Sequence, residues 1–328
     1  MAHRIADLVL GLGGDVTFYT RDAVRPGLRP MMDARAVEHD DLPFTEWVKP
    51  LTHVIWTEVP PISQIKWAQD AGKGVILIPN AHELRRSHRK CCEQADAVLC
   101  TSRHAADQLT AHWELDNCAP LCWDPGVPIL EKDGPADPST PKILYPLELV
   151  SPADQPSILF MLDSMLDAHS ATVTIPYLSS RLTSATRKFL DNLQKRRPAQ
   201  VTLRKRIDIG DWPVLFTGHD LTLWPSSLDH AGLGPLLSVY GGTPVLAFQS
   251  PPCNEFLGAG NALLVPCKHK LSPLGIPAAR LDYRRFGEYF NALLTTPGAL
   301  LELYGGTNGL LRERREQFLS TWKRLLEC

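Results

Sequence analysis

The feature that most constrains the fold of this sequence is an alternation of strand-like and helix-like segments that runs twice along the chain. In the first half, strand and helix patterns follow one another at residues 15–20, 52–57, 62–71, 74–79, 84–94, 97–101 and 102–113. Strands joined by helices form right-handed βαβ units, and such units build mainly parallel sheets. A helical pattern at residues 3–12 opens the chain, with no strand pattern before it. The first half therefore predicts a parallel α/β domain whose usual first strand is either absent from the protein or precedes the given sequence.

A proline-rich interruption at residues 124–141 ends this first series. It holds five prolines and two glycines with little periodicity, which is typical of a linker. The alternation then restarts at residues 142–146, 157–168, 172–175, 184–197, 201–204, 221–224, 235–241 and 244–248, and amphipathic helix patterns follow at 284–295 and 310–326. Because 328 residues exceed one ordinary core, we predict two doubly wound α/β domains. The expected divisions are a first domain at 1–130, a linker at 131–141, a second domain at 142–280, and C-terminal helices at 281–328 that pack across both domains.

Charge and apolar content exclude several classes of protein. The net charge is −2 and 44% of the residues are hydrophobic, which describes a globular chain without a general basic field for nucleic acid. No apolar run approaches the roughly 18 residues that cross a bilayer, so we expect a cytoplasmic protein with no membrane insertion. Cys118 and Cys122 are a conceivable half of a zinc site, but the paired knuckle spacing is missing. We predict reduced thiols and no bound metal.

The most informative segment is 220–266, in which a strand runs into a glycine-rich turn and then a helix. Pro235 fits the first position of that helix. The turn at 231–234 can direct backbone N–H groups at an anion, and the helix dipole adds to the attraction. The carboxyl end of a parallel strand is also where such folds bind ligands. The same residues fit a plain strand–helix turn whose glycines serve packing.

The order of motifs in this segment resembles the donor-binding region of the large retaining glycosyltransferase family 4, which has the GT-B fold. The matching elements are Pro225-Ser226, Asp229, Gly232-Leu233, Gly242-Thr243-Pro244-Val245, Asn254-Glu255 and Leu264-Val265-Pro266. The resemblance implies α/β architecture with two Rossmann-like doubly wound domains and an interdomain cleft. It also implies a metal-independent hexosyltransferase that needs no cofactor. The co-substrate would be a nucleotide-sugar, with a UDP-sugar favoured, and the sugar would pass to an acceptor hydroxyl.

The resemblance also suggests which residues form the site. His82 and Asp229 are implied as catalytic residues, and the donor-binding residues would be Gly232, Leu233, Gly234 and Glu255. Glu58, just after the strand at 52–57, is a candidate base or acceptor ligand. A strand-end histidine, a helix-capping aspartate and exposed loop carboxylates are the structural alternatives for these side chains.

Two departures from the family pattern concern the nucleotide. The second glutamate of the family, which usually holds the ribose, falls on Leu237. The Arg and Lys that bind the diphosphate in the family would follow the strand at 142–146, and no positive charge stands there in this sequence. We expect replacement cations among Arg181, Arg204 and Arg206, near the ends of the next two strands.

A basic cluster at residues 85–90 concerns the acceptor. Arg85, Arg86, Arg89 and Lys90 are predicted to lie on a short helix at the cleft rim, with Arg85 and Arg89 on one face. This cluster is either a solvated helix face or a grip on the phosphates of double-stranded DNA.

The acceptor class stays open at the level of sequence. Residues 58–60, 78–80 and 82–83 resemble segments of bacteriophage enzymes that glycosylate hydroxymethylated bases, a form of DNA modification. A base in a duplex would have to be flipped out to react. The alternatives are a glycosyltransferase acting on a saccharide or small molecule, and a nucleotide-sugar-binding module that has lost catalysis.

Overall fold

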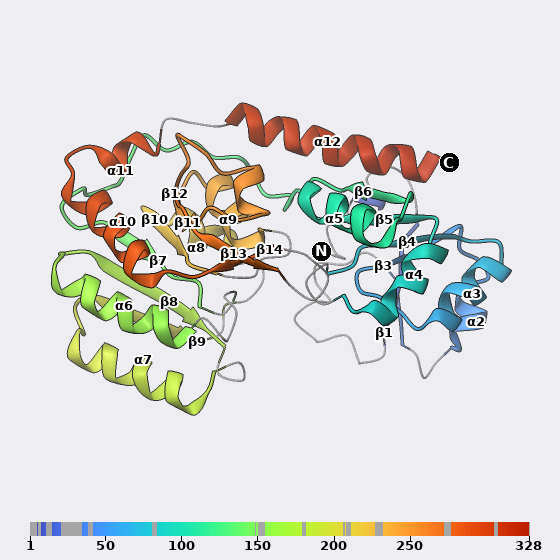
Figure 1. Cartoon of the computed structure of the whole chain (residues 1–328), viewed down its shortest axis with the longest axis horizontal. Coiled ribbons are helices and arrows are strands. Elements are labelled where there is room, and N and C mark those ends of the chain that lie inside the picture. The colour runs from blue at the N-terminus through green and yellow to red at the C-terminus, as the bar shows by residue number, and fades with distance from the viewer. Residues whose placement is uncertain are drawn as a thin grey trace. The chain divides into compact units, whose positions relative to one another are not determined.

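The computed structural model describes residue 5 and residues 8–10, 15–20, 35–38, 42–80, 84–147, 149, 155–178, 182–205, 207, 211–226, 232–271, 277–304 and 308–327. The chain divides into two compact units (Figure 1). The first unit runs to Gly126 and includes the end of the chain from Arg314. The second unit comprises Val127–Leu271 and Pro277–Glu313.

The first unit is built on a parallel four-stranded sheet in the order β3-β4-β5-β6. Its strands are β3 (His53–Trp56), β4 (Gly74–Leu77), β5 (Ala97–Cys100) and β6 (Cys118–Pro120), and its connecting helices are α3 (Ile62–Asp70), α4 (Arg89–Gln94) and α5 (Arg103–Trp113). Val75, Leu77 and Val98 are buried because each strand packs apolar side chains under these helices. A short helix α2 (Phe44–Trp47) and a separate parallel pair, β1 (Thr17–Thr20) with β2 (Arg35–Glu38), complete the described elements.

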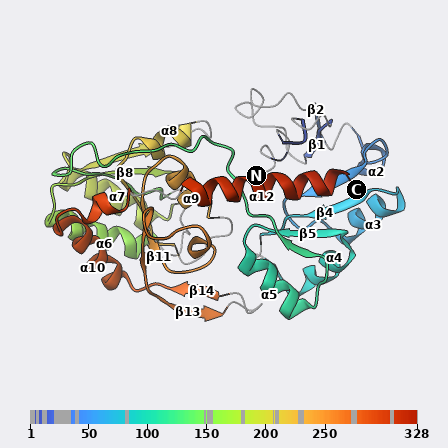
Figure 2. The ribbon, with the colours of Figure 1, turned by 90° about the horizontal axis from the view of Figure 1, so that it is seen from above.

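The second unit is built on a parallel six-stranded sheet in the order β12-β11-β10-β7-β8-β9. The strands are β7 (Lys142–Leu144), β8 (Thr172–Tyr177), β9 (Val201–Lys205), β10 (Leu221–Trp224), β11 (Val245–Phe248) and β12 (Ala262–Val265). The helices between them are α6 (Gln155–Asp167), α7 (Ser184–Arg196), α8 (Trp212–Thr217) and α9 (Leu233–Tyr240). The chain winds outward from β7 to β9 and then crosses back to β10, so right-handed connections place α6 and α8 on opposite faces (Figure 2). This is the doubly wound arrangement that the alternation predicts.

Three further helices and a hairpin follow the sheet. They are β13 (Lys268–Leu271), β14 (Pro277–Arg280), α10 (Tyr283–Thr295), α11 (Ala299–Glu302) and α12 (Asn308–Glu327). Helix α10 packs on α6, and the Phe290 ring meets His169 edge-on at 5.9 Å between centroids. Within the first unit, Phe318 of α12 packs edge-on against Trp123 at 5.4 Å. None of the helices described is long and apolar enough to span a membrane.

The basic helix expected at residues 84–94 forms only in part. The α-helix begins at Arg89, after a short 3₁₀ turn at Arg86–His88, and Arg85 precedes that turn with an extended φ of −121°. The backbone N–H of Arg85 donates to His88 Nδ1 at 3.2 Å, which favours the local turn over a continuous helix. The prediction that Arg85 and Arg89 share one helix face is therefore wrong.

The proline-rich segment at 131–141 belongs to the second unit. Lys132 Nζ donates to the carbonyl oxygen of His219 at 2.8 Å and to Thr243 Oγ1 at 2.6 Å. Asp220 then accepts the backbone N–H groups of Ala136 and Lys142 at 3.2 and 2.8 Å. Although the sequence predicts a linker here, hydrogen bonds hold this segment at the amino ends of β10 and β11.

Candidate functional site

The candidate donor site lies at the carboxyl edge of the six-stranded sheet, where β10 ends at Trp224 and α9 begins at Leu233. Gly232 caps the helix with a φ of 62°, in the left-handed region that favours glycine. The helix therefore starts two residues before Pro235. The N–H groups of Leu233 and Gly234 fall in its first turn, where no acceptor within the helix is in reach. Both the dipole and these N–H groups suit an anion at this edge.

Close packing explains why glycine stands at two positions of this turn. A Cβ on Gly232 would come within 2.4 Å of Phe256 Cζ, and a Cβ on Gly234 within 2.1 Å of Trp224 Cζ3. Any larger residue would push the first turn of α9 away from the sheet. The glycines seat the N-terminus of the helix directly against the end of β10.

Glu255 joins the site from the neighbouring strand. It ends a short 3₁₀ turn, Cys253–Glu255, that follows the carboxyl end of β11, and β11 pairs with β10. Glu255 is half-buried, and the next residue, Phe256, is the one whose ring packs on Gly232. The structure therefore brings Gly232, Leu233, Gly234 and Glu255 together at one sheet edge. Asp229, which the resemblance places here, lies outside the described residues.

The expected replacement cations are not brought to this turn by the described structure. Arg204 lies on β9, the edge strand, with β8 and β7 between it and β10. Strands spaced by about 4.8 Å put β9 roughly 14 Å from β10, beyond the reach of one arginine side chain. Arg181 and Arg206 lie outside the described residues. Leu237, at the position of the second family glutamate, is only 8% exposed and packs in an apolar cluster with Leu144 and Phe216.

In the first unit, the predicted residues are spread over the ends of β3 and β4. Glu58 is exposed and follows the carboxyl end of β3 by two residues. Arg85, Arg86 and Lys90 are also exposed. Arg89 instead pairs with Glu93 at 2.6 Å on its own helix. His82 lies outside the described residues.

The thiols form a cluster that the sequence did not predict. Cys100 on β5 shares a side-chain hydrogen bond with Cys118 on β6, and this bond lowers the pKa of Cys118 while raising that of Cys100. Burial raises the pKa of Cys92, beside them, to about 12. In the part of the chain that the structure describes, no group of three or more His, Cys, Asp or Glu residues is placed to hold a metal ion.

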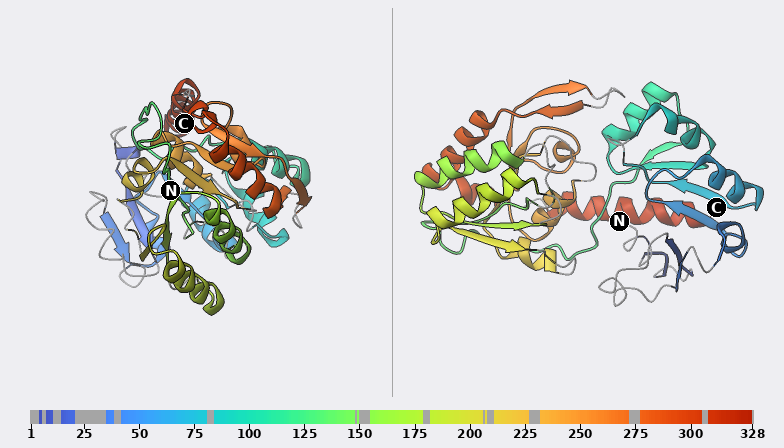
Figure 3. Two further views of the ribbon diagram at one scale, coloured as in Figure 1. Left: turned by 90° about the vertical axis from the view of Figure 1, so that its left-hand side faces the viewer. Right: turned by 90° about the horizontal axis from the view of Figure 1, so that it is seen from below.

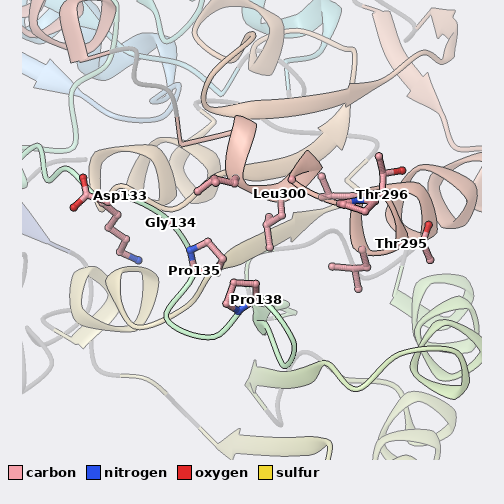
Figure 4. A pocket seen from close by; sticks show the side chains of 13 residues that line it. Asp133, Gly134, Pro135, Pro138, Thr295, Thr296 and Leu300 are labelled. Carbon is pink, nitrogen blue, oxygen red and sulfur yellow. The ribbon is translucent and has the colours of Figure 1, made fainter.

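A pocket lies away from the candidate donor site in the second unit, between the proline-rich segment and the end of α10. Pro135, Pro138 and Leu300 border it, and its volume is about 830 Å³ (Figure 4). Lys132 reaches its rim, and burial lowers the pKa of that ammonium group. Both prolines come from a segment that the sequence presents as linker, so no sequence signal marked this pocket.

The chain is similar in fold to several solved structures. No protein-family model matches the sequence, and no curated protein matches it. Anabaena HepE in complex with UDP and glucose gives a TM-score of 0.69 at 12% identity, covering 100% of this chain and 95% of that one. The lipopolysaccharide outer core galactosyltransferase WaaB gives 0.64 at 13% identity, covering 98% and 94%. Sucrose-phosphate synthase from Thermosynechococcus elongatus gives 0.68 at 14% identity, covering 99% and 91%.

These similarities, at identities far below 25%, establish the fold. The chain has the GT-B fold, with Rossmann-like domains whose parallel sheets have four and six strands. The two α/β domains predicted from the alternation of strands and helices, and the GT-B fold that the family resemblance implies, are confirmed.

Proposed function

We propose that the chain is a nucleotide-sugar-dependent glycosyltransferase whose donor binds at the carboxyl edge of the six-stranded sheet. The observation that carries the proposal is the first turn of α9, seated on Trp224 with Glu255 beside it. A diphosphate fits the N–H groups and the dipole of that turn, and a half-buried carboxylate suits sugar hydroxyls. Structures of the similar HepE contain UDP with glucose and UDP-glucose, which supports a UDP-sugar as the donor here.

The proposed chemistry needs stabilisation of the departing nucleotide diphosphate. Backbone donors fixed at the start of α9 supply this electrostatically, without a metal ion. Asp229 and His82 would orient the sugar at its reacting face, and Glu58 would bind or deprotonate the acceptor hydroxyl. Replacing His82 or Asp229 with Ala should lower turnover by about a hundredfold or more while nucleotide binding persists.

The finer part of the proposal is the acceptor. We propose a hydroxymethylated base in double-stranded DNA, supported by the exposed cations Arg85, Arg86 and Lys90 after the carboxyl end of β4. A saccharide or small-molecule acceptor is the alternative. Incubation with UDP-sugars and either hydroxymethylated DNA or a glycan panel, followed by mass spectrometry, separates them by which product gains a hexose.

The donor assignment is tested by thermal shift with UDP, GDP and ADP. A nucleotide that binds only the folded chain raises the melting temperature, with about 2.7 kcal/mol of stabilisation at a hundredfold excess over Kd. We expect UDP to give the largest shift. Glu255→Gln should reduce the additional shift that UDP-glucose gives over UDP, whereas Glu302→Gln, on the exposed surface of α11, should not. No shift with any of the three nucleotides at millimolar concentration would contradict the donor site.

A further inference from the structure

The hairpin formed by β13 and β14 places two positive charges directly opposite each other. The two strands lie side by side (orange in the right-hand view of Figure 3) and pair antiparallel. Their register sets Lys268 against Arg280. Both side chains are exposed. Like charges that face each other across an antiparallel pair destabilise it, and a two-stranded ribbon is only marginally stable in water. The hairpin therefore carries a cost at its base.

Nothing in the described structure offsets that cost. Across the residues that the structure describes, neither Lys268 nor Arg280 forms an ion pair or a side-chain hydrogen bond. His269, the next residue after Lys268, has its Nε2 atom 3.8 Å from Cys267 Sγ. An anion bound across the two cations would turn the repulsion into attraction.

More positive charge follows the hairpin in the chain. Arg284 and Arg285 lie in the first turn of α10, four and five residues after Arg280. Arg284 Nε lies 3.8 Å from Glu288 with 85% of its side chain exposed, and the Arg285 guanidinium lies 6.0 Å from the Tyr289 ring centroid. Residues 268–285 contain five Lys or Arg residues and one Asp, whereas the whole chain has a net charge of −2. The positive charge is therefore local to this segment and not part of a general excess.

We propose that the surface formed by Lys268, Arg280, Arg284 and Arg285 binds the phosphate backbone of double-stranded DNA. A two-stranded ribbon fits the major groove of B-DNA, which is about 12 Å wide, whereas the major groove of an RNA duplex is too narrow. A membrane surface is the less suitable partner, since α10, which carries Arg284 and Arg285, has none of the large exposed apolar side chains among the residues whose burial the structure describes. Contacts to phosphates need only cations, and they position a duplex without reading its sequence.

The hairpin lies at the same edge of the sheet as the candidate donor site. Lys268 follows the end of β12 by three residues, so the hairpin leaves the same carboxyl edge of the sheet that carries Glu255. A duplex held there lies beside the candidate donor site. The binding surface itself does not depend on glycosyl transfer, because it follows from the charges and the register alone.

The test is fluorescence anisotropy of the full-length chain with a labelled, unmodified 20-base-pair DNA duplex over a salt series. The parent should bind at low salt, with a log–log salt slope of about −0.9 for each phosphate contact. Lys268→Ala/Arg280→Ala should weaken binding at low salt by about tenfold or more and make the slope shallower by about 2. The matched control, Lys66→Ala/Arg312→Ala, removes one exposed lysine and one exposed arginine elsewhere and should change neither quantity.

Two parallel measurements make the outcome decisive. Melting temperature should be unchanged or raised in the Lys268→Ala/Arg280→Ala variant, since a repulsive pair is removed. Anionic phosphatidylserine vesicles and an RNA duplex should bind more weakly than DNA. The proposal is overturned by a parent that does not bind DNA at low salt, by a double variant with the affinity and slope of the parent, or by preferential binding to vesicles or RNA. A missing UDP shift alongside salt-dependent DNA binding would overturn the glycosyltransferase proposal and leave this one standing.

Discussion

A buried ion pair in the first unit gives a quantitative test of the packing of α12. Asp124 is 0% exposed, and its two carboxylate oxygens accept from Arg315, with Nε at 2.9 Å and Nη2 at 3.5 Å. The backbone N–H of Gly126 donates to the same carboxylate at 2.9 Å. One residue earlier on α12, Arg314 Nε donates to the carbonyl oxygen of Trp123 at 2.9 Å. Arg314 and Arg315 of α12 thus bind Trp123 and Asp124, which lie just before the first unit's boundary at Gly126.

The perturbation is Arg315→Met, which keeps most of the side-chain volume and removes the cation. Asp124 would then remain buried without the Arg315 guanidinium. Removing one partner of a buried pair costs about 3–5 kcal/mol, because the other charge is left without compensation. For a domain of this size, that loss lowers the melting temperature by roughly 10 °C or more. The double variant Asp124→Leu/Arg315→Met should recover much of the loss, because replacing both charges by apolar groups removes the uncompensated carboxylate.

The assay is urea unfolding followed by tryptophan fluorescence. Trp123, next to Asp124, packs on Phe318, Phe318 packs on Trp322, and both tryptophans are buried. Arg312→Met is the control: it lies on the same helix, is exposed, and should change stability by no more than about 0.5 kcal/mol. A loss below about 1 kcal/mol for Arg315→Met would refute the reasoning, as would a double variant less stable than the single one.

Three further predictions follow from buried groups. Burial lowers the pKa of His219, so the imidazole is protonated more readily in the unfolded chain than in the folded one, and the free energy of unfolding should fall as pH drops below about 6.5. Urea midpoints between pH 5 and 7.5 measure this fall, and His219→Gln should reduce the change of stability with pH. Gly234→Ala should cost about 1–3 kcal/mol through the clash with Trp224, and Trp224→Leu in the same chain should recover part of the loss in melting temperature. Iodoacetamide at pH 8 should modify Cys118 before Cys92, since the pKa of Cys118 is lowered and that of Cys92 is raised to about 12; peptide mass spectrometry shows the order.

The sequence predicts the parallel sheets well because their strands are short, buried apolar runs. Residues 52–57, 97–101 and 221–224 each contain an observed strand, and the connecting helices agree within a few residues. The sequence misses β6, a strand of three residues, and α8, a helix of six, because both are too short to show a period. The hairpin of β13 and β14 is also missed, since its lysines and prolines resemble a loop.

The basic segment at 85–94 shows why local spacing can mislead. Helical spacing of Arg85 and Arg89 predicts one charged face, but the hydrogen bond from Arg85 N–H to His88 makes a turn there instead. Lys268 and Arg280, in contrast, are far apart in the sequence but close in space. They are twelve positions apart in the sequence and become neighbours only through the antiparallel register. Charge clusters along a sequence and charge clusters on a surface therefore differ in this chain.

The two interpretations of the glycine-rich turn at 231–234 describe one arrangement and are not alternatives. Packing requires Gly232 and Gly234, because Phe256 and Trp224 occupy the space that a Cβ would take. That packing holds the first turn of α9 against the end of β10, so the N–H groups that have no acceptor within the helix stay at the carboxyl edge of the sheet. A larger residue would lift the helix start from the sheet and move the N–H groups with it. Close packing is thus the physical condition for presenting these donors to a phosphate.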